Sequence, residues 1–168
     1  FRSLLLKYKD DFARPWLRET ILKDMTPSVR ARVSFDAADE TEEQHLARYG
    51  EIDIALDSFP FTGATTSFEA LWMGVPVVTL AGDTFVSRMT AEHLIAVGLP
   101  DLVADTSDGC VEIAVRLAGD PARLADLRKS LRARLLASPL MDGRGFAGNL
   151  EDRKSTRLNS SHVSESRM

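Results

Sequence analysis

Residues 51–80 read EIDIALDSFPFTGATTSFEALWMGVPVVTL and constrain the fold more than any other stretch of the chain. The apolar run at 52–56 predicts a strand, the amphipathic pattern at 66–73 predicts a helix, and the apolar run at 75–80 predicts a second strand. Because the run at 52–56 is so apolar, we expect this strand to be buried on both faces. The order of strand, turn, helix and strand is typical of a parallel sheet covered by helices.

A turn of small residues, Gly63-Ala64-Thr65-Thr66, lies directly before the predicted helix. The first N–H groups of a helix have no partner within the helix, and the helix dipole adds a positive potential there. Small side chains let a phosphate approach the backbone, and two threonine hydroxyls add hydrogen-bond donors. We therefore expect this turn to bind the diphosphate of a nucleotide ligand.

Helix and strand alternate along the rest of the chain. Further strands are expected at 3–8, 32–35 and 102–103, and further helices at 15–25, 39–49, 87–97, 108–118 and 121–137. The predicted fold class is α/β, a Rossmann-like parallel sheet with helices on both faces, whose ligands bind at the carboxyl ends of the strands.

Two features of the predicted helices carry further expectations. In the last helix one face is formed by Leu124, Leu127, Leu131 and Leu135. The Arg and Lys side chains at 128–134 lie largely elsewhere, and we expect them to form a solvated face. Gly74 and Gly98 are expected to end the helices that precede them.

The chain has 168 residues, of which 44% are hydrophobic and 27% charged, as is ordinary for one globular domain. Its formal net charge of −4 argues against nucleic acid or an anionic membrane as the main partner. No signal peptide and no membrane-spanning run is recognisable, and the lone Cys110 fits a reducing compartment. We therefore expect a cytoplasmic protein, with Cys110 as a small buried residue on a helix.

The domain organisation follows from the carboxyl-terminal stretch. Residues 1–151 are expected to form one lobe, and residues 152–168 a disordered tail. The tail has five serines and almost no apolar periodicity, and it resembles translated sequencing-adapter sequence, so we expect it not to be native. The chain begins with Phe1 rather than methionine, and we expect it to start inside a longer protein.

Residues near the turn also have purely structural interpretations. Thr66 and Glu69 have the spacing of a capping box, in which Glu69 bonds the helix start and needs no ligand. Asp57 ends a strand at the ligand-facing edge, but an aspartate that bonds its own turn is an equally good interpretation.

Other polar residues are expected to be structural as well. Arg88 is suited to a phosphate, although an ion pair with Asp83 or Glu92 is the preferred interpretation. His93 has no matched acidic partner in the sequence, and we expect it to be structural. No set of His, Cys, Asp and Glu has the spacing of a zinc site, so no metal is expected.

Residues 51–80 resemble the carboxyl-terminal lobe of glycosyltransferase family 41, which contains the O-linked N-acetylglucosamine transferases and the Spindly-type O-fucosyltransferases. The resemblance is carried by DIALD at 53–57, GATT at 63–66, EALWMGVP at 69–76, AGDTFVSR at 81–88 and SPLMD at 138–142. Upstream, EQHLARY at 43–49 resembles the family's glutamate–histidine helix. The resemblance covers most of residues 1–151.

The resemblance implies a GT-B glycosyltransferase with two Rossmann-like lobes, usually behind a tetratricopeptide superhelix. This chain would be the lobe that binds the nucleotide sugar, and the reaction would transfer N-acetylglucosamine or fucose to Ser or Thr of a protein acceptor. The family implies neither a metal nor another cofactor. It places the donor phosphates at Gly63, Ala64, Thr65 and Thr66, the ribose hydroxyls at Glu69 and the base beside His45.

Some positions leave the donor open between UDP-N-acetylglucosamine and GDP-fucose. Ala64 stands where the N-acetylglucosamine transferases usually have histidine, and together with Phe59-Pro60-Phe61 and Glu69 it favours the Spindly-like branch. The family's catalytic histidine and its phosphate-binding glutamine and lysine are expected upstream of Phe1, so we expect no turnover by this lobe alone. A non-catalytic nucleotide-binding module and another GT-B enzyme, such as a sugar-nucleotide epimerase, are the alternatives.

Overall fold

The structure, a computed structural model, describes residues 3–7, 14–36 and 41–153. Every strand pair in these residues is parallel, which confirms the predicted sheet type. The described strands form two sheets, with the orders β1-β2 and β3-β4-β5. They are β1 (Leu4–Lys7), β2 (Val33–Asp36), β3 (Ala55–Leu56), β4 (Val77–Leu80) and β5 (Val103–Ala104).

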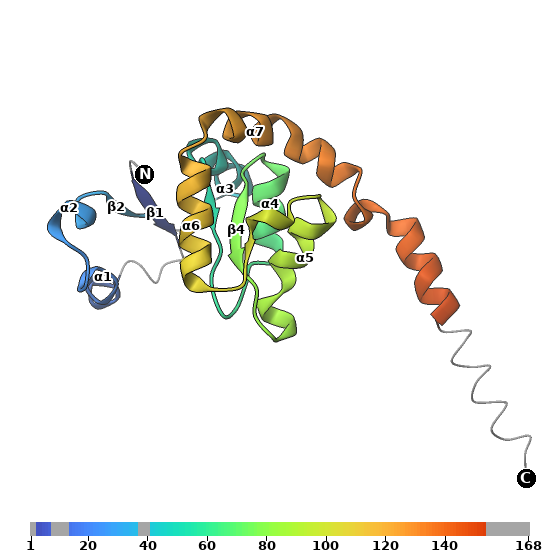
Figure 1. The fold of residues 1–168 in the computed structure, drawn as a ribbon, viewed down its shortest axis with the longest axis horizontal. Helices are drawn as coiled ribbons and strands as arrows, with labels where there is room; N and C mark the ends of the chain where they lie inside the picture. Colours follow the sequence, from blue (N-terminus) through green and yellow to red (C-terminus); the bar gives the residue numbers. More distant parts are fainter. Residues whose placement is uncertain (1–2, 8–13, 37–40, 154–168) are drawn as a thin grey trace, which may run out of the picture.

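Helices follow the strands in the predicted alternation, which confirms the α/β fold class. They are α1 (Pro15–Leu22), α2 (Pro27–Arg30), α3 (Glu42–Arg48), α4 (Thr65–Trp72), α5 (Met89–Ala96), α6 (Ser107–Ala118) and α7 (Pro121–Leu136), with short 3-10 turns η2 (Tyr49–Glu51), η3 (Phe85–Ser87), η4 (Pro100–Leu102) and η5 (Pro139–Met141). Figure 1 shows α6 on one side of β4, α4 and α5 on the other, and α7 across one end of these layers. No helix in the described ranges combines the length and apolarity that a membrane span requires.

The hydrophobic core surrounds β4, the central strand of the larger sheet. Val77, Val78 and Thr79 are at most 2% exposed, since helices cover both faces of this strand. The leucines with almost no exposure that pack in this core are Leu71, Leu94, Leu102, Leu131 and Leu135. Each fully buried leucine contributes about 1.5–3 kcal/mol, so the core between β4 and the helices packed around it contributes much of the stability.

The strand predicted at 52–56 is shorter and less buried than expected. Only Ala55 and Leu56 pair with β4, and Leu56 is 52% exposed, so the prediction of burial on both faces is wrong. The reason is that β3 is an edge strand among the described residues, with β4 on one side only. The strands predicted at 3–8 and 32–35 are confirmed as β1 and β2, which pair with each other in a separate sheet.

The leucine face of α7 is confirmed, and the Arg and Lys side chains at 128–134 are exposed as predicted, although two of the arginines also bond carbonyls of other elements. Arg132 Nε donates to the Trp72 carbonyl at 2.9 Å, and its guanidinium lies 5.0 Å from the Trp72 ring centroid. Arg128 donates to the carbonyls of Tyr49 and Ile52. Carbonyls at the ends of helical turns lack partners within their own helix, and these arginines supply the donors.

A further helix at 143–153 runs away from the layered body, as Figure 1 shows. Its Phe146 is 70% exposed and its Leu150 is 59% exposed. The helix continues two residues past the expected lobe boundary at 151. Residues 154–168, the rest of the expected tail, lie outside the described residues, as do residues 39 and 40 of the helix predicted at 39–49.

Candidate functional site

The candidate site lies at the carboxyl edge of the three-stranded sheet. Because β3, β4 and β5 are parallel, Asp57, Ala81 and Asp105 follow their last residues at the same edge. The helix α4 starts at this edge with Thr65, directly after the small-residue turn. Ligands of open parallel sheets bind at this position, where loops and helix starts converge.

The first turn of α4 has free backbone N–H groups. Its N-cap is Ala64, which has no side chain that caps the helix. The first bond of the helix runs from the Phe68 N–H to the Ala64 carbonyl at 3.1 Å. Within the described ranges, no acceptor takes the N–H of Thr65, Thr66 or Ser67. A helix start with three unpaired donors and a positive dipole end is suited to an anion.

The side chains around this helix start leave room for a ligand. Thr65 and Thr66 are exposed, and Ala64 adds only a methyl group. Gly63, by contrast, is tightly packed, since a Cβ placed on it would lie 2.3 Å from Ser67 Oγ and 2.8 Å from Thr66 Oγ1. A larger residue here would force the Ser67 and Thr66 hydroxyls to move, and the compact turn leaves the exposed side of the helix start uncovered.

Asp57 holds the turn from the sheet side. Its Oδ1 accepts from the N–H of Ser58 at 3.0 Å and from the N–H of Gly63 at 2.8 Å, and its Oδ2 accepts from Thr79 Oγ1 at 2.7 Å. The prediction that this aspartate bonds its own turn is therefore confirmed. The bond to Thr79 also connects the turn to the central strand β4.

Thr90 holds the turn from the helix side. Its Oγ1 donates to the Gly63 carbonyl at 2.7 Å and lies 2.9 Å from Ser67 Oγ. Thr79 and Thr90 are both fully buried, and sequence reasoning assigned neither a role. The signal that could have found them is a hydroxyl next to apolar residues, because a hydroxyl that becomes buried requires a hydrogen-bond partner.

The structure brings His45 and Glu69 together, as a pair across α3 and α4. His45 Nε2 lies 3.0 Å from Glu69 Oε2, and the two side chains are 33% and 29% exposed. The capping-box interpretation of Thr66 and Glu69 is therefore wrong. Because α4 starts at Thr65 rather than after Thr66, Thr66 is already helical and Glu69 is not placed to bond its N–H.

Tyr49 connects this pair to the helix start. It is 8% exposed, its ring meets the His45 ring edge-on at 5.6 Å between centroids, and its hydroxyl donates to the Thr66 carbonyl at 3.2 Å. Burial raises the pKa of Tyr49 to about 12, and the Glu69 carboxylate adds to this effect. Tyr49 is therefore a neutral donor that sequence reasoning did not assign to the site.

Arg88 and His93 behave as their structural interpretations predict. Arg88 Nη2 lies 3.8 Å from Glu92 Oε1, and Nη1 donates to the Gly82 carbonyl at 3.2 Å. His93 meets the Phe68 ring edge-on, and burial lowers the pKa of its imidazole. Cys110 lies on α6 as expected, although it is only half-buried.

Three aromatic side chains are exposed on the loops beside the turn. Phe59 is 53% exposed, Phe61 is 67% exposed and Phe85 is 81% exposed. Thr62 connects the two loops, because its N–H and its hydroxyl both bond the Val86 carbonyl. Sequence reasoning used Phe59 and Phe61 only to choose a branch of the family and gave Phe85 no role.

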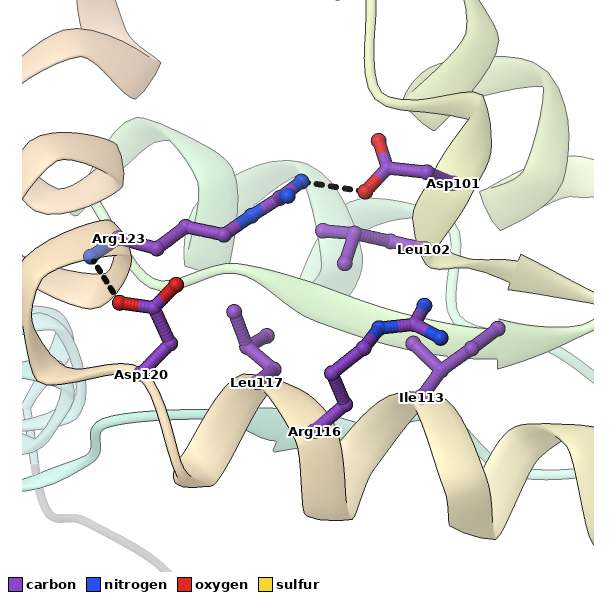
Figure 2. A pocket seen from close by; sticks show the side chains of 7 residues that line it. All are labelled: Asp101, Leu102, Ile113, Arg116, Leu117, Asp120 and Arg123. Atoms are coloured by element: carbon purple, nitrogen blue, oxygen red, sulfur yellow. Dashed lines mark hydrogen bonds and ion pairs between the residues drawn. The ribbon is translucent and has the colours of Figure 1, made fainter.

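A small pocket elsewhere on the molecule does not carry the site (Figure 2). It has a volume of about 80 Å³ and is lined by residues of η4, α6 and the start of α7. Figure 2 shows that Arg123 points toward Asp101 and that Asp120 accepts from the Arg123 N–H. Ligand pockets usually measure about 300–1,000 Å³, so this volume suits water rather than a nucleotide. Among the described residues, no group of three or more His, Cys, Asp or Glu side chains is placed to hold a metal.

Comparison with known sequences relates most of the chain to one family. Residues 14–150 match the family model described as Glycosyl transferase family 41. A probable UDP-N-acetylglucosamine–peptide N-acetylglucosaminyltransferase SPINDLY from Hordeum vulgare is 46% identical over 107 residues, which are 64% of this chain and 11% of that protein. The UDP-N-acetylglucosamine–peptide N-acetylglucosaminyltransferase from Caenorhabditis elegans is 36% identical over 111 residues, which are 66% of this chain and 10% of that protein.

Comparison with solved structures agrees. A mutant of the O-GlcNAc transferase from Thermobaculum terrenum matches with a TM-score of 0.77 and 35% sequence identity. The match covers 90% of this chain and 29% of that chain. The chain therefore spans about a tenth of the length of the curated relatives it matches, and less than a third of the solved one.

Proposed function

The chain belongs to glycosyl transferase family 41, and we propose that it is the donor-binding lobe of a protein O-glycosyltransferase. In this proposal the turn at 63–66 holds the diphosphate of a nucleotide sugar. The observation that carries it is the uncapped start of α4, where the N–H groups of Thr65, Thr66 and Ser67 find no acceptor in the described part of the chain. The exposed hydroxyls of Thr65 and Thr66 add two donors to the same place.

The pair of His45 and Glu69 is proposed to hold the nucleoside. A carboxylate has about four acceptor positions, so Glu69 can keep His45 and still accept from ribose hydroxyls. His45 then presents its ring beside the base, with Tyr49 packed against its edge. Since Glu69 is on the same helix as Thr65 and Thr66, ribose and diphosphate would meet one rigid element.

The proposed chemistry is stabilisation of the leaving group. As the bond to the sugar breaks, negative charge develops on the β-phosphate, and fixed donors aimed at it lower the barrier. The start of α4 supplies such donors from backbone and hydroxyl groups, and we propose that it acts without a metal. Loss of one such donor costs roughly 2.7–4 kcal/mol in comparable oxyanion sites.

The names of the relatives support a donor and an acceptor for the whole enzyme. They describe peptide N-acetylglucosaminyltransferases that use UDP-N-acetylglucosamine, so we propose a nucleotide-sugar donor and a protein acceptor. Ala64 and Glu69 favour the Spindly-like branch, for which GDP-fucose is the alternative donor. We propose a cytoplasmic location, because the one cysteine of this chain, Cys110, fits a reducing compartment.

Calorimetry with UDP and GDP tests the phosphate assignment. We expect one of the two to bind, and the double variant Thr65→Ala/Thr66→Ala to lose most of this affinity because two donors are removed from the phosphate. The matched control is Thr26→Ala/Ser28→Ala, which removes a pair of exposed hydroxyls on α2 that bond each other at 3.1 Å. Equal affinity of the Thr65/Thr66 variant and the parent chain contradicts the proposal.

A further inference from the structure

We propose that Asp57 is a positioning residue that reserves the N–H groups of α4 for the diphosphate, and that Thr90 assists it. The inference rests on the proposed function of the turn at 63–66. Neither side chain touches the ligand in this proposal. Both act through the backbone of Gly63. Its N–H donates to Asp57, and its carbonyl accepts from Thr90.

The bonds of Asp57 reach further than an ordinary turn requires. One oxygen takes the N–H of the next residue, Ser58, and also the N–H of Gly63, six residues along the chain. The other oxygen accepts from Thr79, which is fully buried in β4. The carboxylate therefore fixes both ends of the loop at 58–63 to the centre of the sheet.

The backbone donors of this edge are divided into two sets. Upstream of the helix, the N–H groups of Ser58 and Gly63 are occupied by the internal anion Asp57. In the first turn of α4, the N–H groups of Thr65, Thr66 and Ser67 have no acceptor within the described residues. Since the internal carboxylate is bonded on both oxygens, it is held on the sheet side of the turn, where it repels an incoming diphosphate least.

Thr90 completes the clamp from α5. Its hydroxyl donates to the Gly63 carbonyl, and Ser67 Oγ of the first turn of α4 lies 2.9 Å from the same hydroxyl. This contact fixes the angle between the turn and the helix. A change of that angle would redirect all three free N–H groups together, because they belong to one helical turn.

The test compares a nucleoside diphosphate with the nucleoside alone, using the full 168-residue chain and calorimetry. We expect Asp57→Ala to bind UDP or GDP at least about tenfold more weakly, because the freed N–H groups and the misplaced turn no longer match the diphosphate. Binding of uridine or guanosine should change by less than about twofold, because the nucleoside does not reach the turn. Asp57→Asn keeps an oxygen for both N–H groups and should retain affinity within about threefold.

Variants of Thr90 and of an aspartate far from the turn are compared with Asp57→Ala. Thr90→Val should reproduce the diphosphate-specific loss, whereas Thr90→Ser should not. The matched control is Asp120→Ala, which removes a carboxylate that caps α7 at 2.9 Å. Because α6 runs back from the carboxyl edge, Asp120 lies at the opposite edge of the sheet. Its loss should lower the melting temperature without separating diphosphate from nucleoside.

The outcomes separate this inference from the proposed function. If the parent chain binds neither UDP nor GDP, the proposed function fails. If it binds and Asp57→Ala binds equally well, or loses nucleoside and diphosphate alike, the positioning role is overturned. Amide hydrogen exchange of the ligand-free chain decides independently of binding: Asp57→Ala should speed exchange at Ser58 and Gly63, whose N–H groups lose their acceptor, and unchanged exchange there also overturns it.

Discussion

At the scale of single residues, the position of Glu69 in the fold decides which hydrogen bond its carboxylate makes. By spacing it is a partner for Thr66 in a capping box, but α4 starts two residues too early for this, with Ala64 as its N-cap. Its carboxylate instead meets His45, which is brought to it by the separate helix α3. The helix start is thereby left without a cap, and its donors face outward.

His93 is a residue whose protonation is disfavoured in the folded state. Its ring is half-buried against Phe68, and Nδ1 is buried with no hydrogen-bond partner in the described part of the chain. Burial lowers the pKa of the imidazole, and the charge of Asp57 acts in the opposite direction. Protonation therefore occurs more readily in the unfolded chain than in the folded one.

Stability should consequently fall as the pH drops below about 6.5, the ordinary pKa of histidine, and the His93 contribution should be complete above it. We expect His93→Gln to remove part of this acid-side loss, since glutamine takes up no proton. Urea unfolding of both proteins above and below this pH measures the difference. Stability curves of the two proteins that stay parallel across the range contradict the assignment.

At the scale of elements, α4 and α5 end in the same way. In both, a glycine with positive φ follows the last turn, at 82° for Gly74 and 75° for Gly98. The Val75 N–H bonds the Ala70 carbonyl at 2.8 Å, and the Leu99 N–H bonds the Leu94 carbonyl at 2.8 Å. These are the bonds of a Schellman motif, which turns the chain sharply back toward the sheet.

Substitution of the two glycines should separate the energetic cost of a left-handed backbone from the cost of a steric clash. Gly98→Ala should cost about 1–2 kcal/mol, because its added methyl would make only an ordinary contact with Arg134 Nη1 at 3.9 Å and only the left-handed backbone is disfavoured. Gly74→Ala should cost clearly more, because its Cβ would lie 2.6 Å from the Arg128 carbonyl oxygen of α7. Denaturant unfolding of both variants measures this, and equal costs would show that the contact with α7 does not matter.

At the scale of the whole molecule, the described residues of the candidate site gather at one edge of the larger sheet. The start of α4, the His45 and Glu69 pair and the exposed phenylalanines of the neighbouring loops all belong to the carboxyl edge of the larger sheet. The imidazole beside a carboxylate at this edge is His45 with Glu69, and the proposed function assigns both to the nucleoside rather than to an acceptor. The solved relative is more than three times as long as the matched region.

We therefore expect this chain to bind donor without transferring sugar. Incubation with UDP-N-acetylglucosamine or GDP-fucose and a Ser/Thr acceptor peptide, followed by mass spectrometry of the peptide, should reveal no glycosylated product above a protein-free control. Thr65→Ala/Thr66→Ala provides the comparison if product forms. Transfer by the parent chain that this variant lacks would show that the lobe is catalytic by itself.

The sequence by itself determined the parallel α/β architecture and the position of the turn. Its periodicities located the core leucines of α7, and Gly74 and Gly98 marked the ends of α4 and α5, because these signals depend only on neighbouring residues. Small residues before an amphipathic helix likewise indicated an anion site, although the role of each residue there is still a prediction.

Only the tertiary structure decided which long-range partners each side chain meets. The bonds from Asp57 to Thr79, from Thr90 to Gly63 and from Arg128 to Tyr49 join segments 22 to 79 residues apart. The edge position of β3 was equally invisible, as was the 52% exposure of Leu56 at its end. Hydrogen bonds and burial of this kind follow from the packing of whole elements, which no local pattern encodes.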